Sequence, residues 1–208
     1  MIQVFYAPPS IYDRKVLAVL EEKGLDYEIK RMSFETQDSL KDDYLKLNPN
    51  GEIPTLVDDS FVVYESTAIL EYLNDEYPEP PLLPEDSAGR ARARMVEDYC
   101  DLHFYKAVIR VMIKKTVKHE EPTEEESHKL AEAVKRIEAY LGKQEFIAGP
   151  FTLADCAVMP AVATLEAMGL WESFKPSKAL QDYVKRLKAR PGYKGANLLT
   201  LEAVSSQA

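Results

Sequence analysis

The chain has 208 residues, of which 46% are hydrophobic and 29% charged, and its formal net charge is −9. This length and composition are typical of one or two globular domains and exclude a fibrous or disordered chain. The negative charge disfavours nucleic acid and anionic membranes as partners and favours small molecules or proteins.

Cysteine use and apolar runs narrow the class further. Cys100 and Cys156 lie far apart within helical patterns, so we expect neither a disulfide framework nor a metal site. The longest apolar stretch, residues 156–165, is too short to cross a bilayer and contains Pro160. No signal-peptide pattern begins the chain, and we expect a cytoplasmic protein.

The first part of the chain predicts the element order βαβαββα, because its apolar residues switch repeatedly between alternating and helical spacing. Prolines, glycines and asparagines mark the ends of these elements. The expected strands are residues 2–6, 27–30, 53–57 and 61–64. The first expected helix begins after residue 9 and ends at Gly24, the second covers residues 39–47, and the third covers residues 65–77.

Four prolines between residues 78 and 84 interrupt the pattern and predict a domain boundary. We therefore expect one domain over residues 1–78 and an all-helical domain over residues 86–208. The expected helices are one long helix over residues 87–115, a second from Thr123 to Gly142, a third from Thr152, and a fourth from Ser177 to about residue 191, with a loose tail over 204–208.

The segment Asn48-Pro49-Asn50-Gly51-Glu52-Ile53-Pro54 places a proline directly behind a turn. A cis proline there would leave the neighbouring Ile53 backbone free to pair with an extended peptide. The alternative is an ordinary edge strand with a trans proline.

A second segment, Tyr64-Glu65-Ser66-Thr67, runs from a strand into a helix start. The free N–H groups of that helix and the Ser66 hydroxyl suit a carboxylate, and Glu65 suits an ammonium. Together they fit an α-amino acid head group. The alternative is plain helix capping by Ser66.

The loop after the first strand carries Ser10 at the start of a helix. A hydroxyl there can donate a hydrogen bond to a thiolate and lower the thiol pKa. The alternative is a helix cap shared with Asp13, and Tyr6 and Tyr12 are other candidate hydroxyl donors.

These three segments together resemble the cytosolic glutathione transferase superfamily. The matching runs are Ser-x-x-x-Arg-Lys-Val from Ser10, Asn-Pro-x-Gly-x-Ile-Pro from Asn48, and Glu-Ser-x-Ala-Ile from Glu65. Phe151-Thr152-Leu153-Ala154-Asp155 resembles the family's capping box and hydrophobic staple, so Thr152 and Asp155 are expected to be structural. The resemblance covers nearly the whole chain.

The resemblance implies a thioredoxin-like N-terminal domain followed by an all-helical C-terminal domain. It implies glutathione as co-substrate, no metal, and a homodimer. Ser10 would activate the thiolate, and the glutathione-binding residues would be Glu52, Ile53, Pro54, Glu65 and Ser66.

One residue departs from the family pattern. Many members place Gln or Lys at the position of Glu52, near the glycine carboxylate of glutathione, and a like charge weakens binding unless it turns to solvent. Lys41, Lys46 or Arg14 would be the compensating cations.

The second substrate would be a small hydrophobic electrophile in a pocket between the two domains. If the long helix faces the first loop, the lining residues would be Ile11, Tyr12, Phe104, Tyr105 and Val108. The alternative for each is simple core packing.

The sequence thus predicts a glutathione S-transferase whose thiolate attacks an electrophilic carbon or reduces a disulfide or peroxide. The other candidate is a non-catalytic regulatory binding protein on the same scaffold, resembling stringent starvation protein A, and Glu52 is its best support. A thiol-disulfide oxidoreductase does not fit because the first loop has no cysteine.

Overall fold

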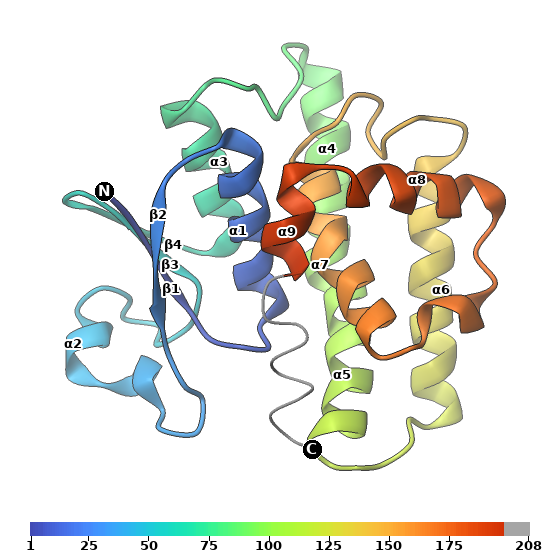
Figure 1. Ribbon diagram of the computed structural model, residues 1–208, viewed down its shortest axis with the longest axis horizontal. Helices are drawn as coiled ribbons and strands as arrows, with labels where there is room; N and C mark the ends of the chain where they lie inside the picture. Colours follow the sequence, from blue (N-terminus) through green and yellow to red (C-terminus); the bar gives the residue numbers. More distant parts are fainter. Residues whose placement is uncertain (198–208) are drawn as a thin grey trace.

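Four strands form one mixed sheet in the computed structural model, which describes residues 1–197 (Figure 1). The strand order is β2-β1-β3-β4, with β1 and β2 parallel and the other pairs antiparallel. Val4 in the middle of β1 lies opposite Ile29 of β2 and Leu56 of β3. The strands are β1 (Ile2–Tyr6), β2 (Tyr27–Arg31), β3 (Thr55–Asp58) and β4 (Phe61–Tyr64).

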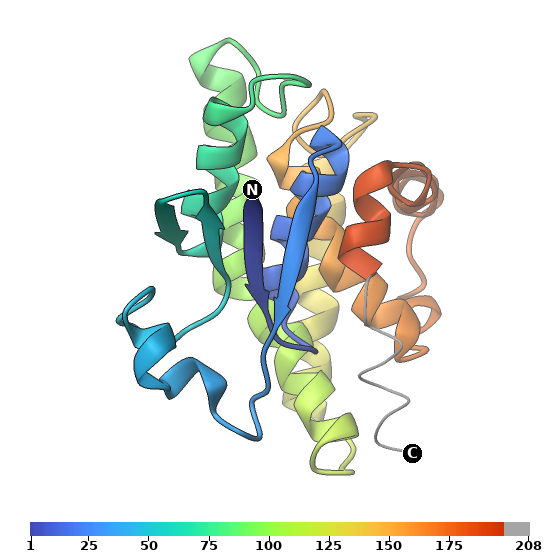
Figure 2. The same ribbon diagram turned by 60° about the vertical axis from the view of Figure 1, so that its left-hand side comes forward.

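Helices α1 (Ile11–Lys23) and α3 (Ser66–Glu76) lie between the sheet and the rest of the chain, and the α2 region lies on the other side of the sheet (Figures 1 and 2). The predicted helix over residues 39–47 is instead a 3₁₀ turn, η1 (Asp38–Leu40), and a single α-helical turn, α2 (Asp42–Leu45). Lys41 has an extended backbone between them, which interrupts the helical path.

The remainder of the described chain is helical, so the predicted fold of a thioredoxin-like domain followed by a helical domain is confirmed. The predicted long helix runs through α4 and α5 but contains a π-helical segment, η2. The elements are α4 (Ser87–Tyr99), η2 (Cys100–Phe104), α5 (Tyr105–Thr116), α6 (Glu124–Leu141), α7 (Leu153–Ala167), η3 (Trp171–Phe174), α8 (Lys178–Lys188) and α9 (Pro191–Asn197).

Helix α7 is the centre of the helical core, because nearly all of its side chains are buried. Its N-terminus carries the predicted capping box: Thr152 caps the helix, and the Asp155 carboxylate accepts the Thr152 N–H at 2.8 Å. Asp155 also accepts the Tyr183 hydroxyl of α8 at 2.8 Å. The structural role expected for this cap is therefore confirmed.

Helix α9 is an element that the sequence did not predict. Pro191, where a helix was expected to end, is the first residue of α9, a position where a helix tolerates proline. Gly195 allows close contact with α1, since a Cβ there would lie 2.6 Å from the Leu17 carbonyl oxygen. Glu22 of α1 accepts the Gly192 N–H at 2.9 Å. The predicted tail over 204–208 lies outside the described residues.

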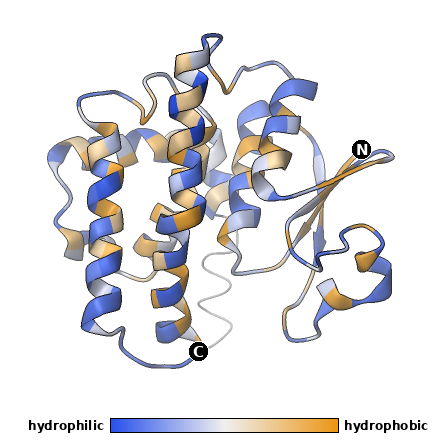
Figure 3. Ribbon diagram, turned by 180° about the vertical axis from the view of Figure 1, so that it is seen from behind, coloured by the Kyte–Doolittle hydropathy of each residue, from blue (hydrophilic) through white to orange (hydrophobic). Residues whose placement is uncertain are grey.

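The helices of the C-terminal part show both hydrophilic and hydrophobic residues along their length (Figure 3), as expected when one side is buried. Both termini of α6 follow the sequence prediction, with a capping box at Thr123 and an end at Gly142. No helix within residues 1–197 is long and apolar enough to cross a membrane.

Candidate functional site

A cavity of about 800 Å³ lies between the loops of the thioredoxin-like domain and the η2–α5 segment. Residues predicted from all three sequence segments line it together. From the first loop come Ser10, Ile11 and Tyr12, from the turn before β3 come Glu52, Ile53 and Pro54, and from the start of α3 come Glu65 and Ser66.

Ser10 is the N-cap of α1, and its side chain is tied to Asp13. The Ser10 Oγ accepts the Asp13 N–H at 3.3 Å and donates to Asp13 Oδ1 at 2.8 Å. The other carboxylate oxygen of Asp13 accepts the Ala7 N–H at 2.8 Å. The predicted shared cap is therefore present, and Ser10 remains partly open to the cavity.

Asp13 is fully buried, and this burial raises the pKa of its carboxyl to about 7 despite the hydrogen bonds from Ala7 and Ser10. Removing a carboxylate from water penalises its charged form more than these hydrogen bonds stabilise it. The group that orients Ser10 thus titrates near neutral pH.

The tertiary contacts of α1 fix the position of this loop. The Arg14 guanidinium is buried and donates to Thr164 Oγ1 of α7 at 2.6 Å and to the Ala196 carbonyl of α9 at 3.2 Å. It also donates to the Ser10 carbonyl at 3.1 Å. The helical domain therefore holds the end of α1 that carries Ser10.

The Ile53–Pro54 peptide bond is cis, as the sequence segment predicted. The Glu52 carbonyl is held by the Tyr44 hydroxyl at 2.6 Å and the Asn48 amide at 2.8 Å. By contrast, within residues 1–197 the amide and carbonyl of Ile53 make no backbone hydrogen bond. An extended ligand can therefore pair with them.

Gly51 makes the turn before Ile53 possible. Its φ is +64°, and a Cβ at this position would lie 2.9 Å from a methyl group of Leu40 and 3.2 Å from the Ser39 carbonyl oxygen. Only glycine combines that backbone conformation with so little space. The backbone conformation and the close packing at position 51 therefore explain why the sequence motif has glycine there.

Glu65 and Ser66 form the opening of α3. Glu65 is the N-cap but makes no side-chain cap, and its φ of +69° is a strained conformation for a residue with a Cβ. Ser66 is the first helical residue rather than the cap, so the alternative of plain capping by Ser66 is wrong. The first N–H groups of α3 thus face the cavity without a side-chain cap.

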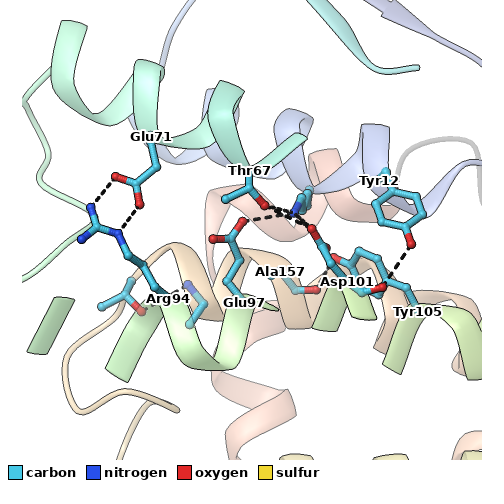
Figure 4. A network of polar contacts seen from close by, with 11 residues as sticks. Tyr12, Thr67, Glu71, Arg94, Glu97, Asp101, Tyr105 and Ala157 are labelled. Atoms are coloured by element: carbon cyan, nitrogen blue, oxygen red, sulfur yellow. Dashed lines mark hydrogen bonds and ion pairs between the residues drawn. The ribbon is translucent and has the colours of Figure 1, made fainter. Parts of the chain in front are cut away.

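Asp101 is a cavity residue that the sequence reasoning missed. It lies in the π-helical segment, close to Thr67 and Glu97 (Figure 4), and its carboxylate accepts the Lys15 amine at 2.7 Å. The same amine contacts Glu97 at 3.1 Å, and Thr67 of α3 donates to Asp101 at 3.1 Å. The four-residue spacing of Glu97 and Asp101 on one helical face was the available signal.

Lys15 is fully buried, whereas the Asp101 side chain remains 20% exposed. The cluster of Lys15, Glu97 and Asp101 holds one amine and two carboxylates. Burial raises the pKa of Glu97, while the Lys15 charge lowers it. Asp101 is therefore the member of the cluster that the cavity reaches.

Three predicted pocket residues do not line this cavity. Phe104, Tyr105 and Val108 are at most 1% exposed and belong to the helical core, so their assignment to the electrophile pocket is corrected. The extra residue of a π-helical turn rotates the following face by about 100°. The wall that faces the cavity instead consists of Leu102, Lys106, Ile109, Met112, Ile113 and Val117, with Phe34 opposite the first loop.

The two tyrosines proposed as alternative donors differ in position. Tyr6 is fully buried in the core and does not line the cavity. Tyr12 does line it, but its hydroxyl donates to the Asp101 carbonyl at 3.2 Å, as Figure 4 shows. Burial, followed by the charges of Asp101 and Glu52, raises the Tyr12 pKa. Ser10 and Tyr12 thus both line the cavity, and each hydroxyl already donates a hydrogen bond within the protein.

Comparison with known proteins gives a consistent result. Residues 9–76 match the glutathione S-transferase N-terminal domain, and residues 99–191 match its C-terminal domain. A stringent starvation protein A homolog from Coxiella burnetii is 30% identical, with 94% of this chain and 91% of that protein covered. Glutathione S-transferase D7 from Drosophila melanogaster is 31% identical, with 97% and 90% covered. A solved delta-class glutathione transferase from Nilaparvata lugens has a TM-score of 0.89 at 29% identity, with both chains fully covered.

Proposed function

Because the chain belongs to the cytosolic glutathione transferase superfamily, we propose that it is a glutathione transferase. Its cavity would bind glutathione beside Ser10, and the glutathione sulfur would attack a small apolar electrophile. The attack forms a carbon–sulfur bond, and the leaving group departs with its electron pair. Reduction of a disulfide or peroxide by the same thiolate is a variant of this activity.

The observation that carries the proposal is that backbone groups without a partner among the described residues lie at one cavity. The free amide and carbonyl of Ile53 and the uncapped N-terminus of α3 open into the same cavity as Ser10. A γ-glutamyl head group fits between Ser66 and the carboxylates of Glu65 and Asp101, because a helix N-terminus attracts a carboxylate and acidic residues attract an ammonium. The cysteinyl part then lies along Ile53.

Ser10 would stabilise the thiolate rather than form a covalent intermediate. A hydroxyl directed at sulfur, together with the dipole of α1, lowers the thiol pKa and raises the fraction of nucleophile near neutral pH. The apolar wall of Ile109, Ile113 and Val117 would hold the electrophile next to that sulfur.

The second candidate is a non-catalytic regulatory protein on the same scaffold, and the match to stringent starvation protein A homologs favours it. A protein with only that role has no need for free backbone donors in a cavity. Domain limits of 1–78 and 86–208 and assembly as a homodimer are part of the proposal.

The test combines calorimetric titration with glutathione and an activity assay on a generic electrophile. We expect millimolar or tighter binding, and a rate for Ser10→Ala about 10- to 100-fold below that of the unmodified protein. Ser10→Thr is the matched control, because it keeps both the hydroxyl and the cap. Absence of binding at millimolar glutathione would favour the regulatory candidate, and unchanged activity in Ser10→Ala would move the catalytic role to Tyr12.

A further inference from the structure

The charges that line the cavity are unevenly distributed. Within the described part of the chain, its carboxylates are Glu52, Glu65 and Asp101, and its one cationic side chain is Lys106. Lys106 lies on α5, in the wall formed by Leu102 and Ile109. Among the described lining residues, the turn before β3 therefore contributes a negative charge and no cation.

The orientation of a bound peptide follows from the proposed function, on which this inference rests. With the head group at Ser66 and the cysteinyl backbone along Ile53, the chain of the peptide continues past Glu52. Ser39, Asn48 and Gly51 also line the cavity. The carboxyl-terminal residue of the thiol is thus placed beside the Glu52 side chain.

None of the cations that the sequence offered as compensation reaches this end. Lys41 is ion-paired with Asp38, and the Lys46 amine lies 2.7 Å from Asp43. Arg14 is buried against α7 and α9 instead. Glu52 is therefore not neutralised by any of the three.

Glu52 is an exposed residue that lines the cavity. Tyr44 and Asn48 both bind its carbonyl oxygen, which fixes the backbone, while its carboxylate makes no ion pair within residues 1–197. Its negative charge contributes to the raised pKa of Tyr12, which lines the same cavity from the first loop.

We propose that Glu52 makes this cavity prefer, over glutathione itself, a γ-glutamyl-cysteinyl peptide whose carboxyl-terminal residue carries no negative charge. A free carboxylate beside Glu52 meets a like charge, whereas an amide N–H or an amine donates a hydrogen bond to it. Glu52 is then a residue that determines which thiol is bound.

The test compares glutathione with its monoethyl ester, in which the glycine carboxylate is blocked. Calorimetric titration of the full chain at low salt should give an ester affinity about two- to fivefold higher than that of glutathione, a difference expected for a partly exposed charge pair. Higher salt should reduce the difference. The variant Glu52→Lys should reverse the preference, and Glu52→Gln should abolish it.

Glu35→Lys is the matched control, because Glu35 is exposed, lies in the same domain and does not line the cavity. It changes the net charge by the same amount as Glu52→Lys and should leave the preference for the ester over glutathione intact. Equal or tighter binding of glutathione by the unmodified protein would overturn the inference while leaving the transferase proposal standing. Failure of both thiols to bind at millimolar concentration would remove both proposals.

Discussion

The Ser10 hydroxyl donates to the buried carboxylate of Asp13 at 2.8 Å, so the group proposed to stabilise a thiolate has its single proton directed away from the cavity. A hydroxyl carries one proton and can donate it to one acceptor at a time. When Asp13 is protonated, the carboxyl can itself donate to Ser10 Oγ, and the Ser10 proton becomes available for sulfur.

This hydrogen bond between Ser10 and Asp13 predicts that thiolate stabilisation by Ser10 depends on pH. Burial raises the Asp13 pKa to about 7, so the neutral carboxyl prevails below that pH and the carboxylate above it. Thiolate stabilisation by Ser10 should therefore weaken as the pH rises through 7. In Asp13→Asn the amide can donate to Ser10 Oγ at every pH, and the pKa of bound thiol should be about one unit lower than in the unmodified protein. Thiolate absorbance and the pH profile of kcat/KM measure this.

Asp26→Asn is the control for that experiment. Asp26 is exposed on the loop after α1, and its substitution makes the same chemical change as Asp13→Asn. Its pH profile should match that of the unmodified protein. Identical profiles for Asp13→Asn and the unmodified protein would contradict control of Ser10 by Asp13.

The ion cluster between the domains predicts a large effect on stability. Lys15→Met leaves Glu97 and Asp101 without their shared amine, and Glu97 has a side chain only 2% exposed. An uncompensated buried charge costs about 3–5 kcal/mol, which urea denaturation should report as a lower free energy of unfolding. Arg94→Met removes the half-exposed pair with Glu71 and should cost less than about 1 kcal/mol. Similar costs for the two variants would show that the Lys15 cluster is not energetically special.

The open N-terminus of α3 predicts opposite effects on stability and binding. Ser66→Asp places a carboxylate where the helix dipole favours one, so the free energy of unfolding should stay unchanged or rise by about 0.3–1 kcal/mol. The same carboxylate would repel the γ-glutamyl carboxylate and weaken glutathione binding more than about tenfold. Calorimetry and thermal unfolding together test this, with Ser66→Ala as the neutral control. Retained glutathione affinity in Ser66→Asp would argue against this head-group position.

Substitutions at the neighbouring α5 residues Val108 and Ile109 should separate effects on stability from effects on electrophile binding. Val108 is fully buried in the core, and Val108→Ala should destabilise the fold by about 2 kcal/mol without a matching change in KM for the electrophile. Ile109 lines the cavity, and Ile109→Ala should raise the KM for an apolar electrophile several-fold with a smaller loss of stability. The same result from both variants would place the electrophile elsewhere.

Local sequence patterns determined the elements whose ends depend on near neighbours. The capping boxes at Thr123 and Thr152, the end of α1 at Gly24 and the turn at Gly51 all follow from residues within a few positions of one another. The segment around Pro54 and the start of α3 could be recognised for the same reason.

Tertiary structure alone decided the features that depend on residues distant in the chain. Asp13 reads as a helix cap, and only its complete burial gives its carboxyl a pKa near neutrality. The π-helical segment turns Phe104 into the core and presents Asp101 to the cavity, where Lys15 of α1 meets it. Pro191 predicts the end of a helix, but in the fold it begins α9, which packs against α1 at Gly195. Burial and electrostatic fields depend on what packs around a residue, and local spacing does not encode that surrounding.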